Sequence, residues 1–146
     1  MRLSMRFGLG CVLLGIAVGA LSGCKEPEPI AFTFRTEPCP QEDPATATFP
    51  EPAEFSFDHH DPRNVLITAP LNCAAKASSP SVAAQRTGQV EFRVVQKFPR
   101  DEGGGEIMAN CNCSRVLRFT LERPLDSGTA VTLTVDELKM ASAIAP

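Results

Sequence analysis

Hydrophobic and polar residues alternate along most of the chain beyond residue 30, and this alternation is typical of half-buried β-strands. It is clearest in three long segments, which are 89–98 (QVEFRVVQKF), 113–122 (CSRVLRFTLE) and 129–135 (TAVTLTV). Shorter segments of the same kind are 30–36, 53–57 and 64–68. Because successive side chains of a strand point to opposite faces, each segment is expected to bury one face.

The apolar members of these alternations form the predicted core. They are Ile30, Phe32, Phe34, Phe55, Phe57, Val90, Phe92, Val94, Leu117, Phe119, Leu121, Val131, Leu133 and Val135. The connectors 99–106 (PRDEGGGE) and 123–128 (RPLDSG) contain the Gly, Asp and Pro residues that hairpin turns need. We therefore expect the last three strands to form a meander.

Only two segments have a composition that suits a helix, 74–85 and 136–143, and Pro80 interrupts the first. Six or seven short strands joined by Pro- and Gly-rich turns favour an all-β domain. The predicted fold is an antiparallel immunoglobulin-like β-sandwich with disulfides, and a small β-barrel is the alternative.

The first residues have the pattern of an export signal. Arg2 and Arg6 precede an apolar run from Phe7 to Leu21, which at 15 residues is shorter than the roughly 18 that a membrane span needs. The run ends in Leu21-Ser22-Gly23-Cys24. This ending resembles the lipobox of bacterial lipoproteins, and the resemblance implies cleavage before Cys24 and acylation of the cysteine.

The resemblance gives the domain organisation that we expect. Residues 1–23 are a signal peptide, residues 24–29 are the acylated cysteine and a stiff tether, and residues 30–146 are a single β-sandwich domain. Two or more acyl chains make attachment to a bilayer stable, so the membrane is a predicted partner and the lipid on Cys24 is the only expected cofactor. In lipoproteins of enteric bacteria an Asp after the cysteine favours inner-membrane retention. Lys25 stands at that place, and the absence of Asp favours a cell-envelope address at the outer membrane.

Charge and composition narrow the range of partners. The formal net charge is −3, and removal of Arg2 and Arg6 with the leader makes it −5. Residues 26–61 hold nine acidic residues against Arg35 alone, so nucleic acid is not an expected partner. The chain contains no Trp and no Tyr, which disfavours a carbohydrate-binding module. The proline-rich stretch 37–52 is predicted to be a long irregular loop.

Four cysteines remain once Cys11 is removed and Cys24 is acylated, and they are Cys39, Cys73, Cys111 and Cys113. In an oxidising compartment an even count indicates disulfides. On a strand, Cys111 and Cys113 would have parallel Cβ vectors about 6.7 Å apart, too far for a bond to each other. We expect them to bond to Cys39 and Cys73 instead, and the sequence leaves the pairing open.

One alternative for these cysteines is redox chemistry. If Cys111-Asn112-Cys113 formed a turn, a strained bond between its two cysteines could take part in thiol–disulfide exchange. Redox proteins usually place their cysteines at the start of a helix, and nothing helical is predicted near this pair.

Both histidines lie in one short stretch, Asp58-His59-His60-Asp61. Imidazole and carboxylate groups bind transition metals, so these four residues are a candidate metal site. However, adjacent residues of a strand face opposite sides, and the following proline favours a polar turn.

The sequence contains no familiar catalytic motif. We therefore predict a non-enzymatic, lipid-anchored envelope protein whose disulfide-stapled domain is a binding or structural module, with another envelope protein as a possible partner. The alternatives are a metal-binding module that uses the histidine stretch and a redox protein that uses Cys111 and Cys113.

Overall fold

The computed structural model describes residues 26–39 and 52–146 of the chain, and within them the protein is all-β and contains no helix. The predicted leader, Cys24 and most of the predicted loop 37–52 lie outside these residues. The strands are β1 (Glu28–Pro29), β2 (Phe32–Thr36), β3 (Glu54–Phe57), β4 (Asn64–Asn72), β5 (Lys76–Ala84), β6 (Val90–Lys97), β7 (Asn112–Leu121), β8 (Ala130–Val135) and β9 (Leu138–Ile144).

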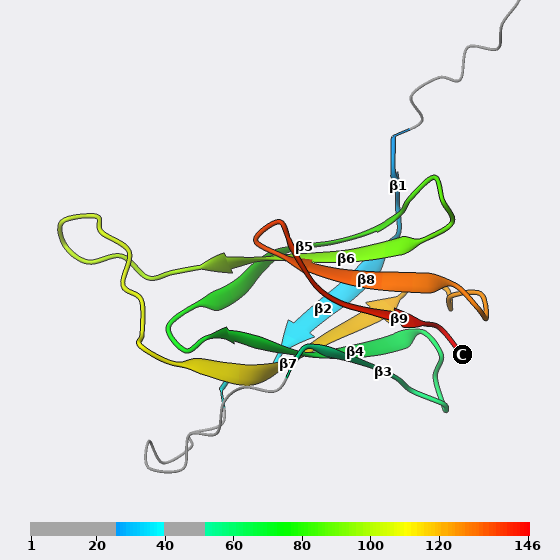
Figure 1. Ribbon diagram of the computed structural model, residues 1–146, viewed down its shortest axis with the longest axis horizontal. Coiled ribbons are helices and arrows are strands. Elements are labelled where there is room, and N and C mark those ends of the chain that lie inside the picture. The colour runs from blue at the N-terminus through cyan, green and yellow to red at the C-terminus, as the bar shows by residue number, and fades with distance from the viewer. Residues whose placement is uncertain (1–25, 40–51) are drawn as a thin grey trace, which may run out of the picture.

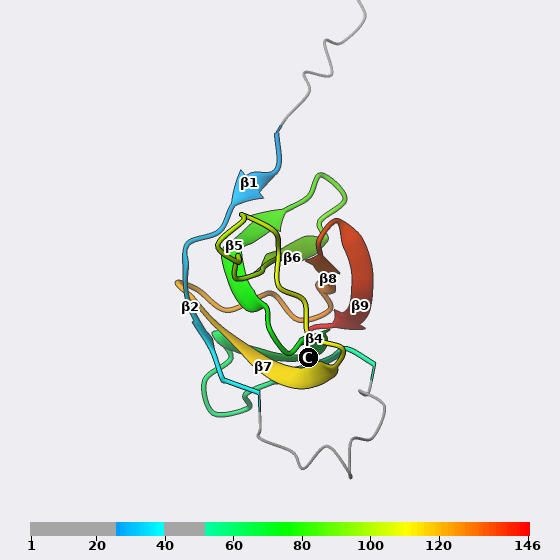
Figure 2. The ribbon, with the colours of Figure 1, turned by 90° about the vertical axis from the view of Figure 1, so that its left-hand side faces the viewer.

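These strands form two sheets that lie face to face as two layers (Figures 1 and 2). Sheet A has five strands in the order β1-β5-β6-β8-β9, and sheet B has four in the order β2-β7-β4-β3. The predicted all-β, sandwich-like architecture with disulfides is therefore confirmed. Among the described residues no strand of one sheet pairs with a strand of the other, so the described strands do not form one closed barrel.

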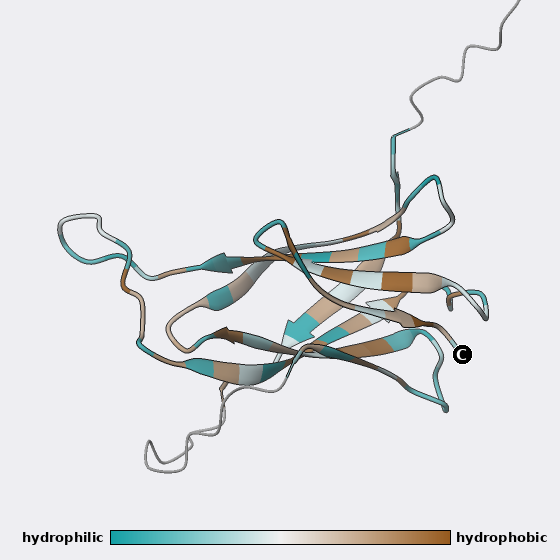
Figure 3. Cartoon of the chain, in the orientation of Figure 1, coloured by the Kyte–Doolittle hydropathy of each residue, from teal (hydrophilic) through white to brown (hydrophobic). Residues whose placement is uncertain are grey.

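The core lies between the sheets and uses one face of each long strand. In sheet B the face of β4 that carries Val65, Ile67 and Leu71 is fully buried, and in sheet A the same is true of Phe92 and Val94. Apolar and polar residues alternate as bands along the strands in Figure 3. All the predicted core residues of the three long alternations are buried, and the shorter ones contribute partly buried residues packed against the core.

Aromatic rings join the two sheets at the centre of the core. The ring of Phe119 on β7 makes an edge contact with that of Phe92 on β6, with 5.1 Å between the centroids. Phe34 and Phe32 of the neighbouring strand β2 also contact the Phe119 ring, with centroid distances of 4.9 and 5.6 Å. Such pairs add stabilisation beyond the area they bury, and Phe119 belongs to three of them.

The predicted meander is wrong. Strand β7 belongs to sheet B, whereas β6 and β8 are neighbours in sheet A and run parallel, with Val90 opposite Val131. Parallel neighbours cannot be joined by a tight turn and need a long crossover. Here β7, lying in the opposite sheet, is that crossover, and the turn residues of 99–106 and 123–128 lie in connections between the sheets.

Both segments considered for helices are strands. In β5 the ladder with β6 shifts between Ser78 and Ser81, and Pro80 lies in this bulge, where its missing N–H breaks no regular ladder bond. Strand β9 follows β8 through a two-residue turn at Asp136 and Glu137, which have φ values of 47° and 69°. Two positive φ values are the geometry of the tight hairpin turn that matches the twist of the strands.

The domain also begins earlier than predicted. Glu28 and Pro29, expected in the tether, form β1 and pair with Ala84 and Ala83 at the edge of sheet A. Proline is tolerated at such an edge because its missing donor faces away from the neighbouring strand. The residues between Cys24 and the first strand are therefore only three.

Substitution of Phe119 by Ala should lower the free energy of unfolding by about 3–5 kcal/mol, because it removes a fully buried ring that contacts both sheets. Chemical denaturation of the purified protein measures this change. The control is Val95→Ala on β6, whose side chain is 40% exposed and which should change stability by less than about 0.5 kcal/mol. Equal effects of the two substitutions would contradict the described core.

Candidate functional site

Cys39, Cys73, Cys111 and Cys113 gather at one end of the two sheets, where the inward face of β7 continues past the apolar core. Side chains two residues apart on a strand share a face, so Cys113 and Arg115 follow on from Leu117. Leu117 is fully buried, Arg115 is 8% exposed and Cys113 is half-buried. Along the inward face of β7, the apolar residues are thus followed by the buried cation of Arg115 and then by the sulfur of Cys113.

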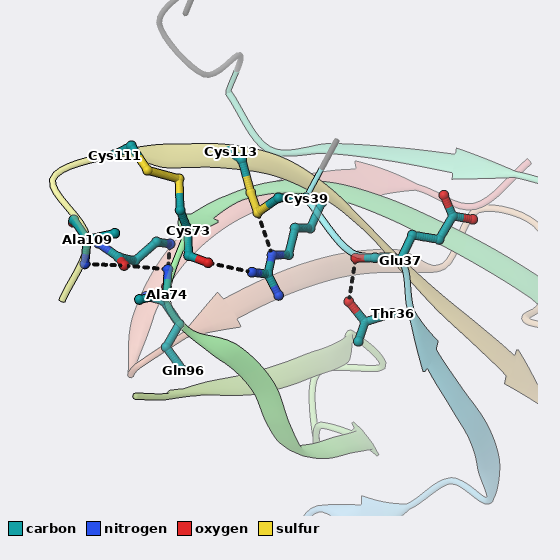
Figure 4. Close-up of a disulfide and its surroundings, with 11 residues drawn as sticks. Thr36, Glu37, Cys39, Cys73, Ala74, Gln96, Ala109, Cys111 and Cys113 are labelled. Carbon is teal, nitrogen blue, oxygen red and sulfur yellow. Dashed lines mark hydrogen bonds between the residues drawn. A yellow bond between two sulfur atoms is a disulfide. The ribbon is translucent and has the colours of Figure 1, made fainter. Parts of the chain in front are cut away.

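Both disulfides end at the start of β7. Cys39, which follows β2, bonds to Cys113, and Cys73, which follows β4, bonds to Cys111 (Figure 4). Their Cα atoms are 5.9 and 5.7 Å apart, within the usual range for disulfides. Cys111 and Cys113 therefore bond to different partners, as expected from their spacing, and the hypothesis of a bond between them is wrong because the strand geometry holds them apart.

These bonds close long loops, with partners 74 and 38 residues apart. In the chain-entropy description each loop closure of this length stabilises the fold by about 4 kcal/mol. The shorter loop lies inside the longer one, so the two contributions are not additive. Because β2 and β4 flank β7 in sheet B, the two disulfides hold the ends of three neighbouring strands of this sheet.

The two disulfides are also close to each other. The Sγ atoms of Cys39, Cys73 and Cys113 all lie within 4.8 Å of one another. Arg115 lies beside them, since its Nε donates a hydrogen bond to Cys39 Sγ at 3.1 Å and its Nη2 donates one to the carbonyl of Cys73 at 3.1 Å. No ion pair joins Arg115 to a carboxylate within residues 26–39 and 52–146.

A polar network closes the same end of the molecule across the two sheets. Gln96 on β6 accepts a hydrogen bond from the backbone N–H of Asn72 on β4 at 2.8 Å. Gln96 also donates to Asp136 at 2.9 Å, while the Asn72 side chain donates to the carbonyl of Ala109 at 2.7 Å and accepts its N–H at 3.2 Å. The network fixes the end of the β6–β7 connection, at Ala109, relative to both sheets.

Three neighbouring sulfurs have the spacing of a metal site, and they are the only such group of three or more metal-binding residues in the part of the chain that the structure describes. Thiolates, not disulfide sulfurs, bind metals. Since all four cysteines are in disulfides, the cluster has no ligand for a metal in this state.

The predicted metal site at Asp58, His59, His60 and Asp61 is a turn between β3 and β4, and its side chains are not brought together. Asp58 accepts a hydrogen bond from the backbone N–H of His60 at 2.9 Å. Asp61 forms a bidentate pair with Arg63, at 2.8 and 2.9 Å. Both histidines are exposed. Each carboxylate therefore has a structural partner within the turn.

The same contacts shift the titration of the two acids. The backbone hydrogen bond from His60 is the main cause that lowers the pKa of Asp58 below 3.8. The hydrogen bond from the Arg63 side chain is the main cause that lowers the pKa of Asp61. Both shifts favour the ionised carboxylates that the turn uses as acceptors.

A second candidate site, which the sequence analysis did not predict, is an open groove of about 690 Å³ on the outer face of sheet A. Most of the residues that line it are polar or charged, including Glu26, Gln85, Glu91 and Lys139, and Pro27 lines it as well. Thr132 and Thr134 of β8 also line it, and each is only 8% exposed although both lie on the outer face. The groove combines charged and hydroxyl groups from β6, β8 and β9.

Glu91 is the hydrogen-bonding centre of this groove. Its carboxylate accepts bonds from Thr134 Oγ1 at 2.7 Å, Gln85 Nε2 at 2.8 Å and Arg93 at 3.1 Å. The bond from Thr134 is the main cause that lowers the pKa of Glu91 below its ordinary value of 4.5. Glu91 is therefore an ionised, fully engaged acceptor at neutral pH rather than a proton donor.

The comparisons with known proteins give no relative. No protein-family model, curated protein or solved structure matched this chain. Within the described residues there is also no helix long and apolar enough to cross a membrane.

For one of the site residues, Arg115, the sequence alone indicates an unusual position. Arg115 is in phase with Leu117, Phe119 and Leu121, so the alternation by itself places a charge on a buried face. An inward-pointing charge on a strand is unusual unless it has a partner. The groove had no such signal, because Glu91 and Thr134 come together only through the pairing of β6 with β8.

The Glu91→Gln variant should be less stable than the wild type at pH 7, since an amide replaces a carboxylate that accepts three side-chain bonds. When the pKa of a carboxyl is lower in the folded state than in the unfolded state, the carboxyl stabilises the fold at any pH above its unfolded-state pKa. This contribution is lost as the pH falls through the folded-state pKa. The difference in free energy of unfolding should therefore shrink below about pH 4.5. Denaturation curves at pH 7 and pH 3 measure it.

Glu102→Gln in the exposed β6–β7 connection is the control and should change stability little at either pH. A difference between wild type and Glu91→Gln that stays constant from pH 7 to pH 3 would show that the ionised carboxylate is not the stabilising form.

Proposed function

We propose that this protein is a lipid-anchored component of a bacterial cell envelope, whose disulfide-bonded β-domain is a binding or structural module held close to the membrane. The observation that carries the proposal is the lipobox-like ending Leu21-Ser22-Gly23-Cys24 after a charged start and a 15-residue apolar run. Two disulfides in a small domain also suit an oxidising compartment outside the cytoplasm.

The short distance between the anchor and the fold supports a fixed position at the membrane. Glu28 is the first residue of β1 and pairs with Ala84. Four residues of extended chain span at most about 14 Å, so an acylated Cys24 would hold the edge of sheet A near the bilayer surface. The domain would lie against the membrane rather than at the end of a long linker.

This attachment would orient the domain relative to the membrane. Strand β5 runs nine residues from Lys76, near the disulfides, to Ala84, which pairs with β1. At 3.3 Å per residue these ends are about 26 Å apart. The β6–β7 connection projects from the end of the molecule opposite the β5–β6 turn (Figure 1), and both disulfides are attached at the start of β7, where this connection ends. In the proposed orientation they face away from the membrane and towards other envelope components.

The groove on sheet A would lie on the membrane side, because Glu26 and Pro27 form part of its lining and follow Cys24 by two and three residues. Its hydroxyl, amide and charged groups suit a polar ligand, and its position suits one presented at the membrane surface. The groove is therefore the binding surface that we propose for an envelope partner.

We further propose the immunoglobulin-like class for the fold. Two sheets that pack face to face over one alternating core, with connections that pass between the sheets, support this class. Two features depart from its usual form. Strands β6 and β8 are parallel, and both disulfides join neighbouring segments of sheet B rather than the two sheets.

An outer-membrane address completes the proposal, and Lys25 after the acylated cysteine supports it. The enteric rule concerns Asp at this place, and Lys25 has the opposite charge. Fractionation of the envelope into inner and outer membranes would test this part separately from the anchor itself.

Substitution of Cys24 by Ala should abolish lipid attachment and leave the unprocessed chain, since the thiol is the group that receives the lipid. Mass spectrometry of the protein extracted from membranes should find acylated Cys24 as the first residue of the wild type. Cys11→Ala is the matched control, because Cys11 lies within the leader, and this variant should be acylated as the wild type is.

Two results would overturn the proposed anchor. One is a wild-type protein that keeps Met1 and carries no lipid. The other is a Cys24→Ala variant that fractionates and is processed as the wild type is. Either result would remove the anchor without bearing on the disulfides or on the two-sheet fold.

A further inference from the structure

We propose that the paired disulfides are a thiol–disulfide exchange site, in which Cys73 moves its bond from Cys111 to Cys113 and Arg115 stabilises the Cys39 thiolate that is released. The electron donor is a protein dithiol, which is oxidised to a disulfide. This inference goes beyond the binding or structural role and does not depend on the lipid anchor.

The first support is the position of Cys73 relative to the other disulfide. Its Sγ lies within 4.8 Å of both Cys39 Sγ and Cys113 Sγ. On the β4–β7 ladder Leu71 pairs with Cys113, and the backbone N–H of Cys73 bonds to the carbonyl of Cys111 at 3.0 Å. Cys73 and Cys113 are therefore diagonal neighbours on one face, and such neighbours are within reach of each other's side chains. A freed Cys73 thiolate has the second disulfide beside it.

The second support is a difference in access. Cys111 is exposed, whereas its partner Cys73 and the other two cysteines are half-buried. Exchange begins with a thiolate that reaches a disulfide sulfur from solution. Cys111 is the most exposed of the four cysteines, and attack on its sulfur releases Cys73 as the leaving group, next to the second disulfide.

The third support is Arg115, which favours release of the Cys39 thiolate over release of the Cys113 thiolate. Its Nε lies 3.1 Å from Cys39 Sγ, and an adjacent guanidinium stabilises a thiolate. A sulfur that is more stable as a thiolate leaves faster in exchange. Attack of Cys73 on Cys113 would release Cys39 directly to the guanidinium. Attack on Cys39 would release Cys113, for which no such hydrogen bond exists among the described residues.

The fourth support is the burial of the Arg115 charge, which a purely structural pair of disulfides does not require. Arg115 is 8% exposed, and its hydrogen bonds go to a disulfide sulfur and a carbonyl, which are both neutral acceptors. A buried charge without an opposite charge is costly. A Cys39 thiolate would offset this cost, so the site is electrostatically more favourable in the partly reduced state.

The exchange balances in three steps. A thiolate of the donor attacks Cys111 Sγ, forms a mixed disulfide and releases the Cys73 thiolate. Cys73 attacks Cys113 Sγ, the Cys73–Cys113 bond forms, the Cys39–Cys113 bond breaks, and Cys39 leaves as a thiolate beside Arg115. The second thiol of the donor attacks the donor's own sulfur in the mixed disulfide and releases Cys111, which takes one proton.

The net change is a two-electron oxidation of the donor dithiol and the loss of one disulfide from this protein. Of the two protons of the donor, one stays on Cys111 and one enters the solvent. The protein retains one disulfide, now between Cys73 and Cys113, and therefore keeps β4 joined to β7 while the segment after β2 is released from its bond.

The sharpest test is the Cys111→Ser variant, which leaves Cys73 without its partner and needs no reductant. After equilibration at pH 8, acid quenching and alkylation with N-ethylmaleimide, peptide mapping by mass spectrometry identifies the free cysteine. We expect the label on Cys39 and a Cys73–Cys113 link. A label on Cys73 with an intact Cys39–Cys113 bond would overturn the proposal.

The wild-type protein gives a second test that does not depend on this variant. Partial reduction by dithiothreitol, followed by the same quench and mapping, should yield a one-disulfide species labelled on Cys39 and Cys111. The proposal fails if that species is labelled on Cys73 and Cys111. It also fails if all four thiols appear together without a one-disulfide species.

The role of Arg115 is tested in the Cys111→Ser background. Arg115→Met, similar in length but uncharged, should lower the ratio of Cys39-labelled to Cys73-labelled protein roughly tenfold, the factor expected for loss of a charge-assisted hydrogen bond. It should also move the pH profile of Cys39 alkylation to higher pH. Arg115→Lys, which keeps the charge, should restore most of the ratio.

Arg118→Met is the matched control, since Arg118 lies on the same strand with a side chain that is 41% exposed and faces Glu37 at 3.6 Å. It should leave both the ratio and the pH profile unchanged. Equal ratios in Arg115→Met and Arg118→Met would show that Arg115 does not direct the exchange.

Discussion

The structure depends on one face of strand β7. Because alternate side chains of a strand share a face, a single row carries Leu121, Phe119 and Leu117 into the core and continues to Arg115 and Cys113. Strand β7 lies between β2 and β4 in sheet B, so this row also sets where the two flanking strands meet it. The position of the aromatic centre and that of the cysteine cluster are consequences of the same register.

The two ends of that row have different physical character. At the Phe119 end, the rings of Phe92, Phe34 and Phe32 exclude water and the stabilisation is hydrophobic. At the Cys113 end the sheets are joined by hydrogen bonds through Gln96 and Asn72, and sheet B is closed by covalent bonds. The domain therefore combines an apolar core with a polar, sulfur-rich end.

The groove on sheet A shows how a second site can arise from topology. Thr134 reaches Glu91 only because β8 returns beside β6 as a parallel neighbour. The crossover through β7 that makes this pairing possible is the same connection that carries Cys111 and Cys113 to the far end of the molecule. One chain path thus gives the domain both the polar groove on sheet A and the sulfur cluster at the start of β7.

The sequence by itself determined which residues face inward and which cysteines cannot bond to each other. Both follow from the two-residue period of a strand, which is a local property: it placed Val90, Phe92, Leu117 and Phe119 in the core and kept Cys111 from Cys113. Only the tertiary structure decided which sheet each strand joins and which cysteine pairs with which. It also decided that segments 74–85 and 136–143 form strands rather than helices. Those outcomes depend on contacts between segments far apart in the chain. Turn residues and helix-forming composition are local properties, and they do not specify which strand will be the neighbour.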